Sequence, residues 1–374
     1  MKIQVKEVQN DKELDAFVKF PMILYKNNPY YVPPIINDEK QSMSKEHNPI
    51  FREAEARYFL AYKDNKIVGR IAAIINWKEV KEQGKSKMRF GWFDTIDDIE
   101  VTKALLDVVH QIGKENQLEF VEGPVGFSNL DKAGLLTKGF DKLATMVGLY
   151  NEAYYMEHFE QLGYETSSEW IEFSLPAPTV LPEKVVKFNK IIQERYKLRE
   201  LKFKKTKELL PFVDEMFDLL DKTYSPLETY VPIADYQIEH YKNKYIPFIN
   251  PDYVNVIVDE NNKMVAFAIT MPSYSKALQK AKGKLFPFGW YHLLQANRKN
   301  DSAAFYLIGV DPKLQGKGVT ALIFSAMYET FKRNNIKYLE TNPELVGNDN
   351  VQVLWKPYNP VNHKRRKTFK KAIN

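Results

Sequence analysis

The chain has 374 residues, more than one hydrophobic core of roughly 250–300 residues usually serves, so we expect two domains. Its composition of 44% hydrophobic and 27% charged residues excludes a disordered chain. The absence of cysteine excludes disulfides, thiolate metal ligands and cysteine nucleophiles. No apolar run approaches the ~18 residues that a membrane span needs, so we expect a cytoplasmic protein with no membrane span.

The net charge of +6 comes from the end of the chain. Residues 363–373 contain no acid and hold six basic residues, Lys364, Arg365, Arg366, Lys367, Lys370 and Lys371. We interpret this tail first as a solvated face of a strand or helix, and second as a contact for phosphates or an acidic partner. Nucleic-acid binding is not expected, because acids balance the basic residues elsewhere.

The first half of the chain shows strand and helix patterns in turn. Alternation of apolar and polar residues predicts strands, and a stripe such as Val101, Leu105 and Val109 predicts a helix. In chain order we expect a strand at 3–8, a helix at 11–25, strands at 57–62 and 67–75 joined by a turn at 63–66, a strand at 88–93, a helix at 100–115, a strand at 120–124, a helix at 154–162 and a strand at 169–175.

A proline-rich stretch divides the chain. Pro176, Pro178 and Pro182 lie close together, and prolines interrupt both helices and strand pairing. We therefore predict a first domain at 1–175, a linker and helix at 176–196, and a second domain at 197–374.

The second half repeats the order of the first. We expect a strand at 198–203, a helix at 207–224, a hairpin of strands at 253–258 and 264–271, a strand at 304–310, a loop and helix at 315–334, and a strand at 338–341. The repetition predicts an α/β fold, with α+β character and mixed sheets. Two tandem domains would each contain a mostly antiparallel twisted sheet flanked by helices.

An insertion at 273–300 follows the second hairpin. Its aromatic residues are Phe286, Phe288, Trp290 and Tyr291. Two interpretations stay open: these rings line a pocket for an acyl chain or an aromatic acceptor, or they form a core between the domains. The insertion also contains His292, a candidate general base.

A glycine-rich loop joins the strand that ends at Val310 to an amphipathic helix. Its sequence is Gln315-Gly316-Lys317-Gly318-Val319-Thr320. Glycine lets the backbone approach a phosphate closely, and the unpaired N–H groups of a helix N-terminus point at the anion. Because Lys317 adds a positive charge, the loop predicts a phosphate-binding site.

This loop, with its Val-Asp-Pro lead-in, resembles the coenzyme A pyrophosphate loop of the GNAT N-acyltransferase superfamily, usually written Arg/Gln-x-x-Gly-x-Gly/Ala. Gln315 and Gly318 match that pattern, and Thr320 departs from it at the last position. The resemblance implies an acyl-CoA donor such as acetyl-CoA, with its pyrophosphate on the loop. It also implies that the pantetheine pairs with the preceding strand, at Ile308 and Val310.

The first half lacks such a loop. Segments 28–34, 68–73 and 90–94 resemble those of a bacterial family of tandem GNAT-like proteins. Where the loop should follow, the chain instead contains the carboxylates Asp94, Asp97, Asp98 and Glu100. They would repel a pyrophosphate by about 1–4 kcal/mol for each close like-charge pair. We predict that this half binds no coenzyme A, and that Asp97 and Asp98 cap the following helix.

The resemblance also implies a mechanism. A neutral amine attacks the thioester, a backbone N–H near Val310 stabilises the oxyanion, and an acid protonates the leaving thiolate. The usual acid is a tyrosine spaced Asn-x-x-Ala-x-x-x-Tyr, but here Asn348 is followed at that spacing by Trp355. Tyr358 is the substitute we consider, if the helix continues past Pro357.

Two polar residues after the last predicted strand complete the candidate site. Glu340 is the candidate general base, and Asn342 lies beside it to orient the amine. No metal is expected, because the histidines and acids show no metal-ligand spacing.

Two functions remain open. The first is an N-acyltransferase that moves an acyl group from acyl-CoA to a small-molecule amine. Acyl carrier protein is a possible second donor, since such a protein is acidic and would suit the basic tail. The alternative is a catalytically silent protein that binds coenzyme A or acyl groups, which Trp355 and the altered first half favour.

Overall fold

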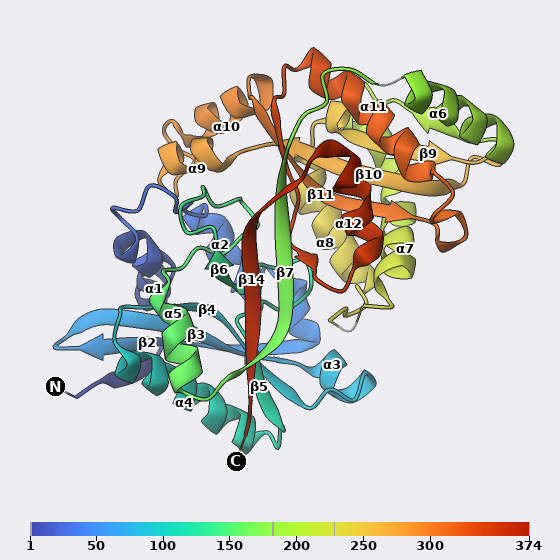
Figure 1. Cartoon of the computed structure of the whole chain (residues 1–374). Coiled ribbons are helices and arrows are strands. Elements are labelled where there is room, and N and C mark those ends of the chain that lie inside the picture. The colour runs from blue at the N-terminus through green and yellow to red at the C-terminus, as the bar shows by residue number, and fades with distance from the viewer. Residues whose placement is uncertain (1, 182, 228, 374) are drawn as a thin grey trace. The chain divides into compact units, whose positions relative to one another are not determined.

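The computed structural model describes residues 2–181, 183–227 and 229–373, which form two units (Figure 1). Of the described residues, unit 1 contains 2–171, 274–293 and 363–373, and unit 2 comprises Glu172–Ser273 and Leu294–Asn362. Each unit is therefore assembled from separate stretches, whereas the predicted bounds of 1–175, 176–196 and 197–374 follow the chain without interruption. The linker residue Pro182 lies outside the described residues.

The sheet of unit 1 is mostly antiparallel. Its strand order is β1 (Gln4–Glu7), β2 (Ala54–Lys63), β3 (Lys66–Asn76), β4 (Lys87–Thr95), β5 (Phe120–Gly123) and β14 (Val361–Ala372), and β6 (Leu135–Lys138) also pairs with β14. Only the β4–β5 pair is parallel among these pairings. The turn between β2 and β3 places Asp64 and Asn65 at φ 51° and 60°. Such left-handed pairs form the two-residue turn that suits the twist of a hairpin, and Asp and Asn tolerate it.

The helices of unit 1 are α1 (Asp11–Leu24), α2 (Ile36–Ser42), α3 (Trp77–Glu82), α4 (Ile99–Glu115), α5 (Tyr154–Gln161) and α9 (Ser275–Ala281), with a 3-10 turn η1 (Pro49–Arg52). Three of them, α1, α3 and α4, begin at a side-chain cap. Asp98 accepts a hydrogen bond from the Glu100 N–H, which confirms its predicted role as the cap of α4. Asp97 instead faces His158, with Oδ1 and Nε2 3.2 Å apart.

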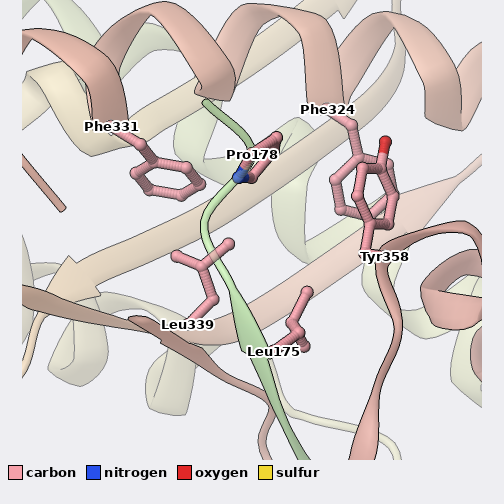
Figure 2. Close-up of a pocket in the computed structure, with 6 residues that line it drawn as sticks. All are labelled: Leu175, Pro178, Phe324, Phe331, Leu339 and Tyr358. Atoms are coloured by element: carbon pink, nitrogen blue, oxygen red, sulfur yellow. The ribbon is translucent and has the colours of Figure 1, made fainter. Parts of the chain in front are cut away.

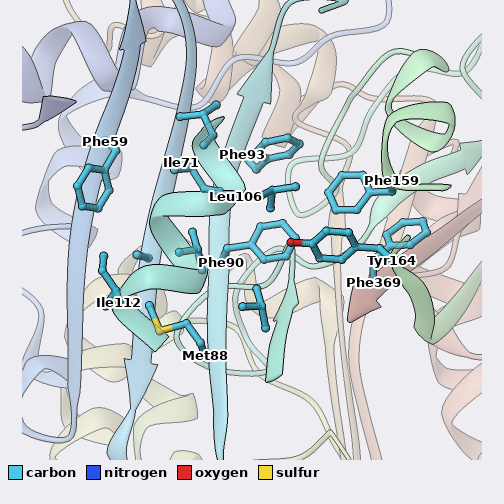
Figure 3. Close-up of a cluster of buried hydrophobic side chains, with 14 of the residues drawn as sticks. Phe59, Ile71, Met88, Phe90, Phe93, Leu106, Ile112, Phe159, Tyr164 and Phe369 are labelled. Carbon is cyan, nitrogen blue, oxygen red and sulfur yellow. The ribbon is translucent and has the colours of Figure 1, made fainter. Parts of the chain in front are cut away.

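Aromatic residues fill the core of unit 1 (Figure 3). The predicted stripe of α4 is fully buried against the sheet. Phe159 on α5 stacks on Phe90 of β4 and on Phe369 of β14, with ring centroids 5.9 and 4.8 Å apart. The C-terminal strand is therefore part of this core.

The basic tail forms the strand β14, which buries some of its basic side chains and exposes others. Lys364 and Arg366 on β14 are each 1% exposed. The Arg366 guanidinium donates a hydrogen bond to the Leu149 carbonyl. Arg365 lies 3.2 Å from Glu169. Several of the tail's charges thus contact protein groups, while the side chains of Arg365 and Lys370 are exposed.

Unit 2 contains the remaining strands. Its strand order is β7 (Glu165–Pro176, which begins in unit 1), β12 (Tyr338–Glu340), β11 (Ser302–Val310), β10 (Met264–Pro272), β9 (Val254–Val258) and β8 (Arg199–Leu201), and the short β13 (Glu344–Leu345) pairs with β7. The β11–β12 pair is parallel, and the β7–β12, β10–β11, β9–β10 and β8–β9 pairs are antiparallel.

The helices of unit 2 are α6 (Glu183–Tyr196), α7 (Val213–Tyr224), α8 (Asp235–Tyr245), α11 (Val319–Arg333) and α12 (Asp349–Trp355), and α10 (Gly289–Arg298) begins in unit 1 and ends in unit 2. Its 3-10 turns are η2 (Thr206–Phe212), η3 (Ile246–Phe248), η4 (Pro251–Tyr253), η5 (Pro312–Leu314) and η6 (Lys356–Tyr358). The helix predicted at 207–224 starts as η2 because Pro211 supplies no N–H.

Both units follow one order of elements. In each, a hairpin is followed by a strand, a helix and a parallel strand: β2-β3-β4-α4-β5 in unit 1 and β9-β10-β11-α11-β12 in unit 2. This confirms the predicted fold class. Within the described residues, no helix is long and apolar enough to cross a membrane.

Candidate active site

The strand β11 continues past its parallel partner. Pairing between β11 and β12 ends at Ala304 opposite Glu340, where β12 also ends, while β11 runs on to Val310. On its other side, Tyr306 forms a bulge, because Ile269 pairs with Leu307 but Thr270 pairs with Phe305. Bulges re-aim strand groups and occur next to active sites. The edge of β11 beyond Ala304 is therefore a place where an extended ligand could pair with the backbone.

The predicted glycine loop follows directly. The loop starts after η5, and its two glycines adopt left-handed conformations, Gly316 at φ 72° and Gly318 at φ 85°. Gly318 is the N-cap of α11 and makes no side-chain cap, so the first N–H groups of the helix receive no such partner. Gln315 turns away from the loop and donates to the Val310 carbonyl at 3.2 Å. This arrangement suits an anion at the start of α11.

Helix α6 borders the loop, a neighbour that the sequence did not predict. A Cβ placed on Gly318 would lie 2.6 Å from the Phe188 ring, and Lys317 Nζ lies 5.8 Å from the Tyr196 ring centre. Asn189 of α6 also donates a hydrogen bond to Ser325 of α11. A bulky residue at position 318 would displace Phe188. Only the helical pattern of the linker hints at α6, and nothing in it specifies this contact.

Glu340 and Asn342 lie where the pairing of β11 with β12 ends. The Asn342 amide nitrogen donates to the Tyr306 carbonyl at 2.8 Å, so this residue holds the bulge of β11. Glu340 is half-buried, and one of its carboxylate oxygens lies within 4.8 Å of a carboxylate oxygen of Glu172 on β7. Glu172 is fully buried. It was missed in the sequence, because a charged residue in an alternating strand normally faces solvent.

Trp355 does not take the place of an acid. It is 1% exposed and packs against Phe305 and Phe324, with ring centroids 4.7 and 5.3 Å apart. Its indole N–H donates to the Glu344 carboxylate at 2.6 Å. The tryptophan is therefore a core residue with one polar contact.

Glu344 is a second titratable residue that could not be recognised from the sequence. Burial raises the pKa of its carboxyl to about 7, although the hydrogen bonds from Trp355 and Thr341 act in the opposite direction. A carboxyl with this pKa carries a proton for part of the time at neutral pH and can donate it. The sequence contains one indirect signal for this carboxyl. A tryptophan at position 355 has an indole N–H that needs an acceptor when the ring is buried.

Tyr358 lies in the turn η6, because α12 ends at Trp355 and Pro357 stops its continuation. Its ring lies 5.5 Å from that of Phe324, and burial raises the pKa of the phenol, which stays neutral at physiological pH. Figure 2 shows both rings among the residues that line a small apolar pocket: Leu175, Pro178, Phe324, Phe331, Leu339 and Tyr358. The volume of this pocket is about 10 Å³. That volume holds about one water molecule.

The insertion aromatics are exposed and do not form a core. The exposed fractions of Phe286, Phe288, Trp290 and Tyr291 are 76%, 69%, 48% and 46%. The interpretation as a core is thus wrong, and the interpretation as a pocket lining stays a prediction. His292 belongs to unit 1, whereas Glu340 belongs to unit 2.

In unit 1 the corresponding strand edge is occupied by the chain itself. Pairing of β4 with β5 ends at Arg89, and next to it the Val125 N–H donates to the Phe90 carbonyl at 2.8 Å. Asp94 does not face an anion site, because it is buried and paired with Arg70 at 2.7 Å. Burial raises the pKa of Asp94, while Arg70 acts against that rise. These contacts support the prediction that unit 1 binds no coenzyme A.

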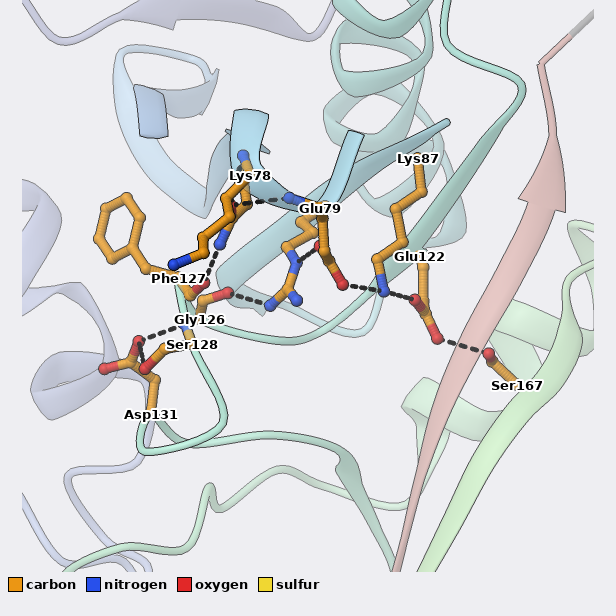
Figure 4. Close-up of polar contacts among 11 residues, drawn as sticks. Lys78, Glu79, Lys87, Glu122, Gly126, Phe127, Ser128, Asp131 and Ser167 are labelled. Carbon is orange, nitrogen blue, oxygen red and sulfur yellow. Dashed lines mark hydrogen bonds and ion pairs between the residues drawn. The ribbon is translucent and has the colours of Figure 1, made fainter. Parts of the chain in front are cut away.

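A buried ionic network holds the loop after β5, which contains Val125 (Figure 4). Glu79 bonds Arg89 at 2.7 Å and Lys87 at 2.8 Å, and Lys87 also bonds Glu122 at 2.7 Å. Arg89 donates in addition to the Gly126 carbonyl at 2.9 Å, which fixes the loop after β5. Burial acts to raise the pKa of Glu79, but Arg89 and Lys87 outweigh it and hold the pKa below its ordinary value.

Solved structures share this architecture. A tandem GNAT protein from the clavulanic acid biosynthesis pathway, solved without acetyl-CoA, superposes with a TM-score of 0.58 at 10% identity, over 100% of this chain and 99% of its own. A GCN5-related N-acetyltransferase from Sphaerobacter thermophilus gives a TM-score of 0.54 at 9% identity, over 100% and 96%. The protein thus has the tandem GNAT fold, and the resemblance noted in the sequence is confirmed at the level of fold.

Two curated proteins are similar along most of the chain. Protein YghO of Escherichia coli (strain K12) is 25% identical over 376 residues, 99% of this chain and 95% of its own length. A protein named bacterial ceramide synthase, from Caulobacter vibrioides, is 24% identical over 324 residues, 84% and 82% of the two chains. No family model matches the chain.

Proposed function

We propose that the protein is an N-acyltransferase that binds an acyl-CoA in unit 2 and transfers the acyl group to an amine. The observation that carries this proposal is the combination of the β11 edge that runs on beyond β12 and the glycine loop at the start of α11. The edge offers backbone groups to the pantetheine amides, and the helix N-terminus offers N–H groups to the pyrophosphate. Ile308 and Val310 on β11, and Gln315 to Thr320 in the loop, are the proposed contacts.

In the proposed reaction, the amine nitrogen attacks the thioester carbonyl, the carbon–sulfur bond breaks, and an amide and free coenzyme A form. Glu340 takes the proton from the amine, and Tyr358 or Glu344 returns one to the thiolate. A backbone N–H near Val310 carries the oxyanion. Asn342 was predicted to orient the amine. Since its amide is bonded to Tyr306, we assign it instead to holding the bulged strand in place.

The acceptor is proposed as a small-molecule amine. One relative carries the name ceramide synthase, and a ceramide is the amide of a fatty acid with a long-chain amine. Long-chain amines are therefore the first acceptors to try, with long-chain acyl-CoA as the donor. Acyl carrier protein remains a second proposed donor.

The proposal is tested by ligand-induced shifts in Tm. A ligand at 100 times its Kd stabilises a protein by about 2.7 kcal/mol. We expect such a shift with acyl-CoA in the wild type, and its loss in Gly316→Asp. Gly84→Asp is the matched control, because both glycines are exposed, have φ of 72° and 65°, and offer open space to a side chain. A shift that survives in Gly316→Asp, or no shift with any thioester, would refute the assignment of the loop.

A catalytically silent acyl-binding protein is the second candidate, and the burial of Trp355 favours it. Turnover separates the two. Because the chain has no cysteine, a thiol reagent detects only the coenzyme A that the reaction releases. We expect Glu340→Gln to lower kcat by roughly 10²-fold or more without loss of the Tm shift, and Glu329→Gln on the exposed face of α11 to change neither. Binding without thiol release from any amine would select the silent protein.

A further inference from the structure

Four aromatic side chains project from one short stretch of unit 1. Phe286, Phe288, Trp290 and Tyr291 are 46–76% exposed, and they follow one another within six residues of chain. Proteins leave single apolar side chains in water, but clustered aromatic rings mark an interaction surface. We call residues 276–291 the aromatic–lysine segment.

The base of this segment is fixed to unit 1. Leu278 and Ala281 of α9 are buried in a cluster with Tyr25 and Val32. The Gly283 carbonyl accepts a hydrogen bond from the Ile36 N–H at 2.9 Å. Below the rings the backbone is therefore anchored, so their exposure reflects a held conformation.

The tip of the segment folds on itself. The Trp290 N–H donates to the Leu285 carbonyl at 2.8 Å, and its indole N–H donates to the Pro287 carbonyl at 2.9 Å. Gly289 permits this turn, because a Cβ there would lie 1.9 Å from the Lys284 carbonyl oxygen. These local bonds hold the rings of Phe286 and Phe288 outward.

The charge around the rings is mostly positive. Lys276, Lys280, Lys282 and Lys284 are all exposed, and the sequence contains no acid between Glu260 and Asp301. On the neighbouring helix α2, Asp38 is exposed and Glu39 bonds the Trp92 indole. Four positive charges thus outweigh the acids next to the segment.

We propose that the aromatic–lysine segment docks the protein on the surface of an anionic phospholipid bilayer. Phe286, Phe288 and Trp290 enter the headgroup region, where aromatic rings are favoured, and the lysines contact lipid phosphates. An acidic protein would match the lysines but leave several rings in water. Peripheral docking needs no spanning helix, and it does not depend on the proposed acyl transfer.

Flotation with vesicles tests the proposal. We expect the full-length protein to bind vesicles of phosphatidylcholine with phosphatidylglycerol, and salt or the omission of phosphatidylglycerol to weaken binding roughly tenfold. Phe286→Ser should weaken binding severalfold, whereas Phe248→Ser should not. Phe248 is the matched control, because it is 75% exposed and lies in unit 2, apart in sequence from the segment.

The lysine contribution has its own comparison. Lys280→Gln with Lys284→Gln should reduce binding to anionic vesicles only, and Lys207→Gln with Lys222→Gln, both exposed in unit 2, should leave it unchanged. An unaltered Tm for every variant shows that it is folded. Equal binding to neutral and anionic vesicles, or equal effects of Phe286→Ser and Phe248→Ser, would overturn the proposal. So would retention on immobilised acyl carrier protein with no vesicle binding, which would assign the segment to a protein partner.

Discussion

The contact between Trp355 and Glu344 joins a neutral donor to a carboxyl in an apolar surrounding. The indole N–H satisfies one oxygen, but little charge faces the carboxyl, and burial raises the pKa of Glu344 to about 7. Folding is therefore linked to proton uptake at this residue. In the unfolded chain the carboxyl of Glu344 has a pKa near 4.5, so it releases its proton at a lower pH than in the folded protein.

This linkage sets the sign of a pH effect. The stabilisation from protonated Glu344 is complete below pH 4.5 and is lost as the pH rises to about 7, a change of roughly 3 kcal/mol. Glu344→Gln keeps the acceptor but cannot ionise. We therefore expect its unfolding free energy to exceed the wild-type value increasingly as the pH rises from 5 to 8. Urea unfolding at both pH values measures this, and a pH-independent difference would contradict it.

At the scale of elements, the ionic network around Arg89 ties the loop after β5 to the edge of β4. Arg89, Glu79 and Lys87 are all at least nine-tenths buried, so each charge depends on its partners for solvation. Removing one partner leaves an uncompensated buried charge, which is costlier than the loss of a surface pair.

We predict that Arg89→Ala lowers the unfolding free energy by about 3–5 kcal/mol. Arg57→Ala is the control, since its pair with Glu7 is half exposed and is expected to contribute about 0–1 kcal/mol. Denaturant midpoints compare the two variants. Similar costs for both would mean that the buried network does not stabilise unit 1 more than a surface pair does.

Local signals explain which parts of the site could be predicted. The loop from Gln315 to Thr320 could be inferred because its glycines determine backbone conformation within a few residues. Phe188 and Glu172 could not, since α6 and β7 bring them to the site from far along the chain. The burial of Lys364 and Arg366 could not be predicted either, because lysines and arginines in a fully solvated strand and in a half-buried one have the same sequence pattern.

At the scale of the molecule, the two units share one order of elements but differ at the strand edge and at the glycine loop. Unit 2 leaves the edge of β11 beyond Ala304 without its parallel partner and keeps the glycine loop, whereas unit 1 covers the edge of β4 with Val125 and lacks the loop. The repeated order of elements was predictable from periodicity. The division into discontinuous units was not, because the hydrophobic pattern of a segment does not specify which sheet it joins.

The position of β14 has a consequence for synthesis. The strand that contributes Phe369 to the core of unit 1 leaves the ribosome after every residue of unit 2. Domains usually fold in the order of their translation, the N-terminal one first. Here unit 1 cannot complete its sheet until β14 emerges. Throughout elongation, β5 presents an open edge that chaperones or other nascent chains can meet.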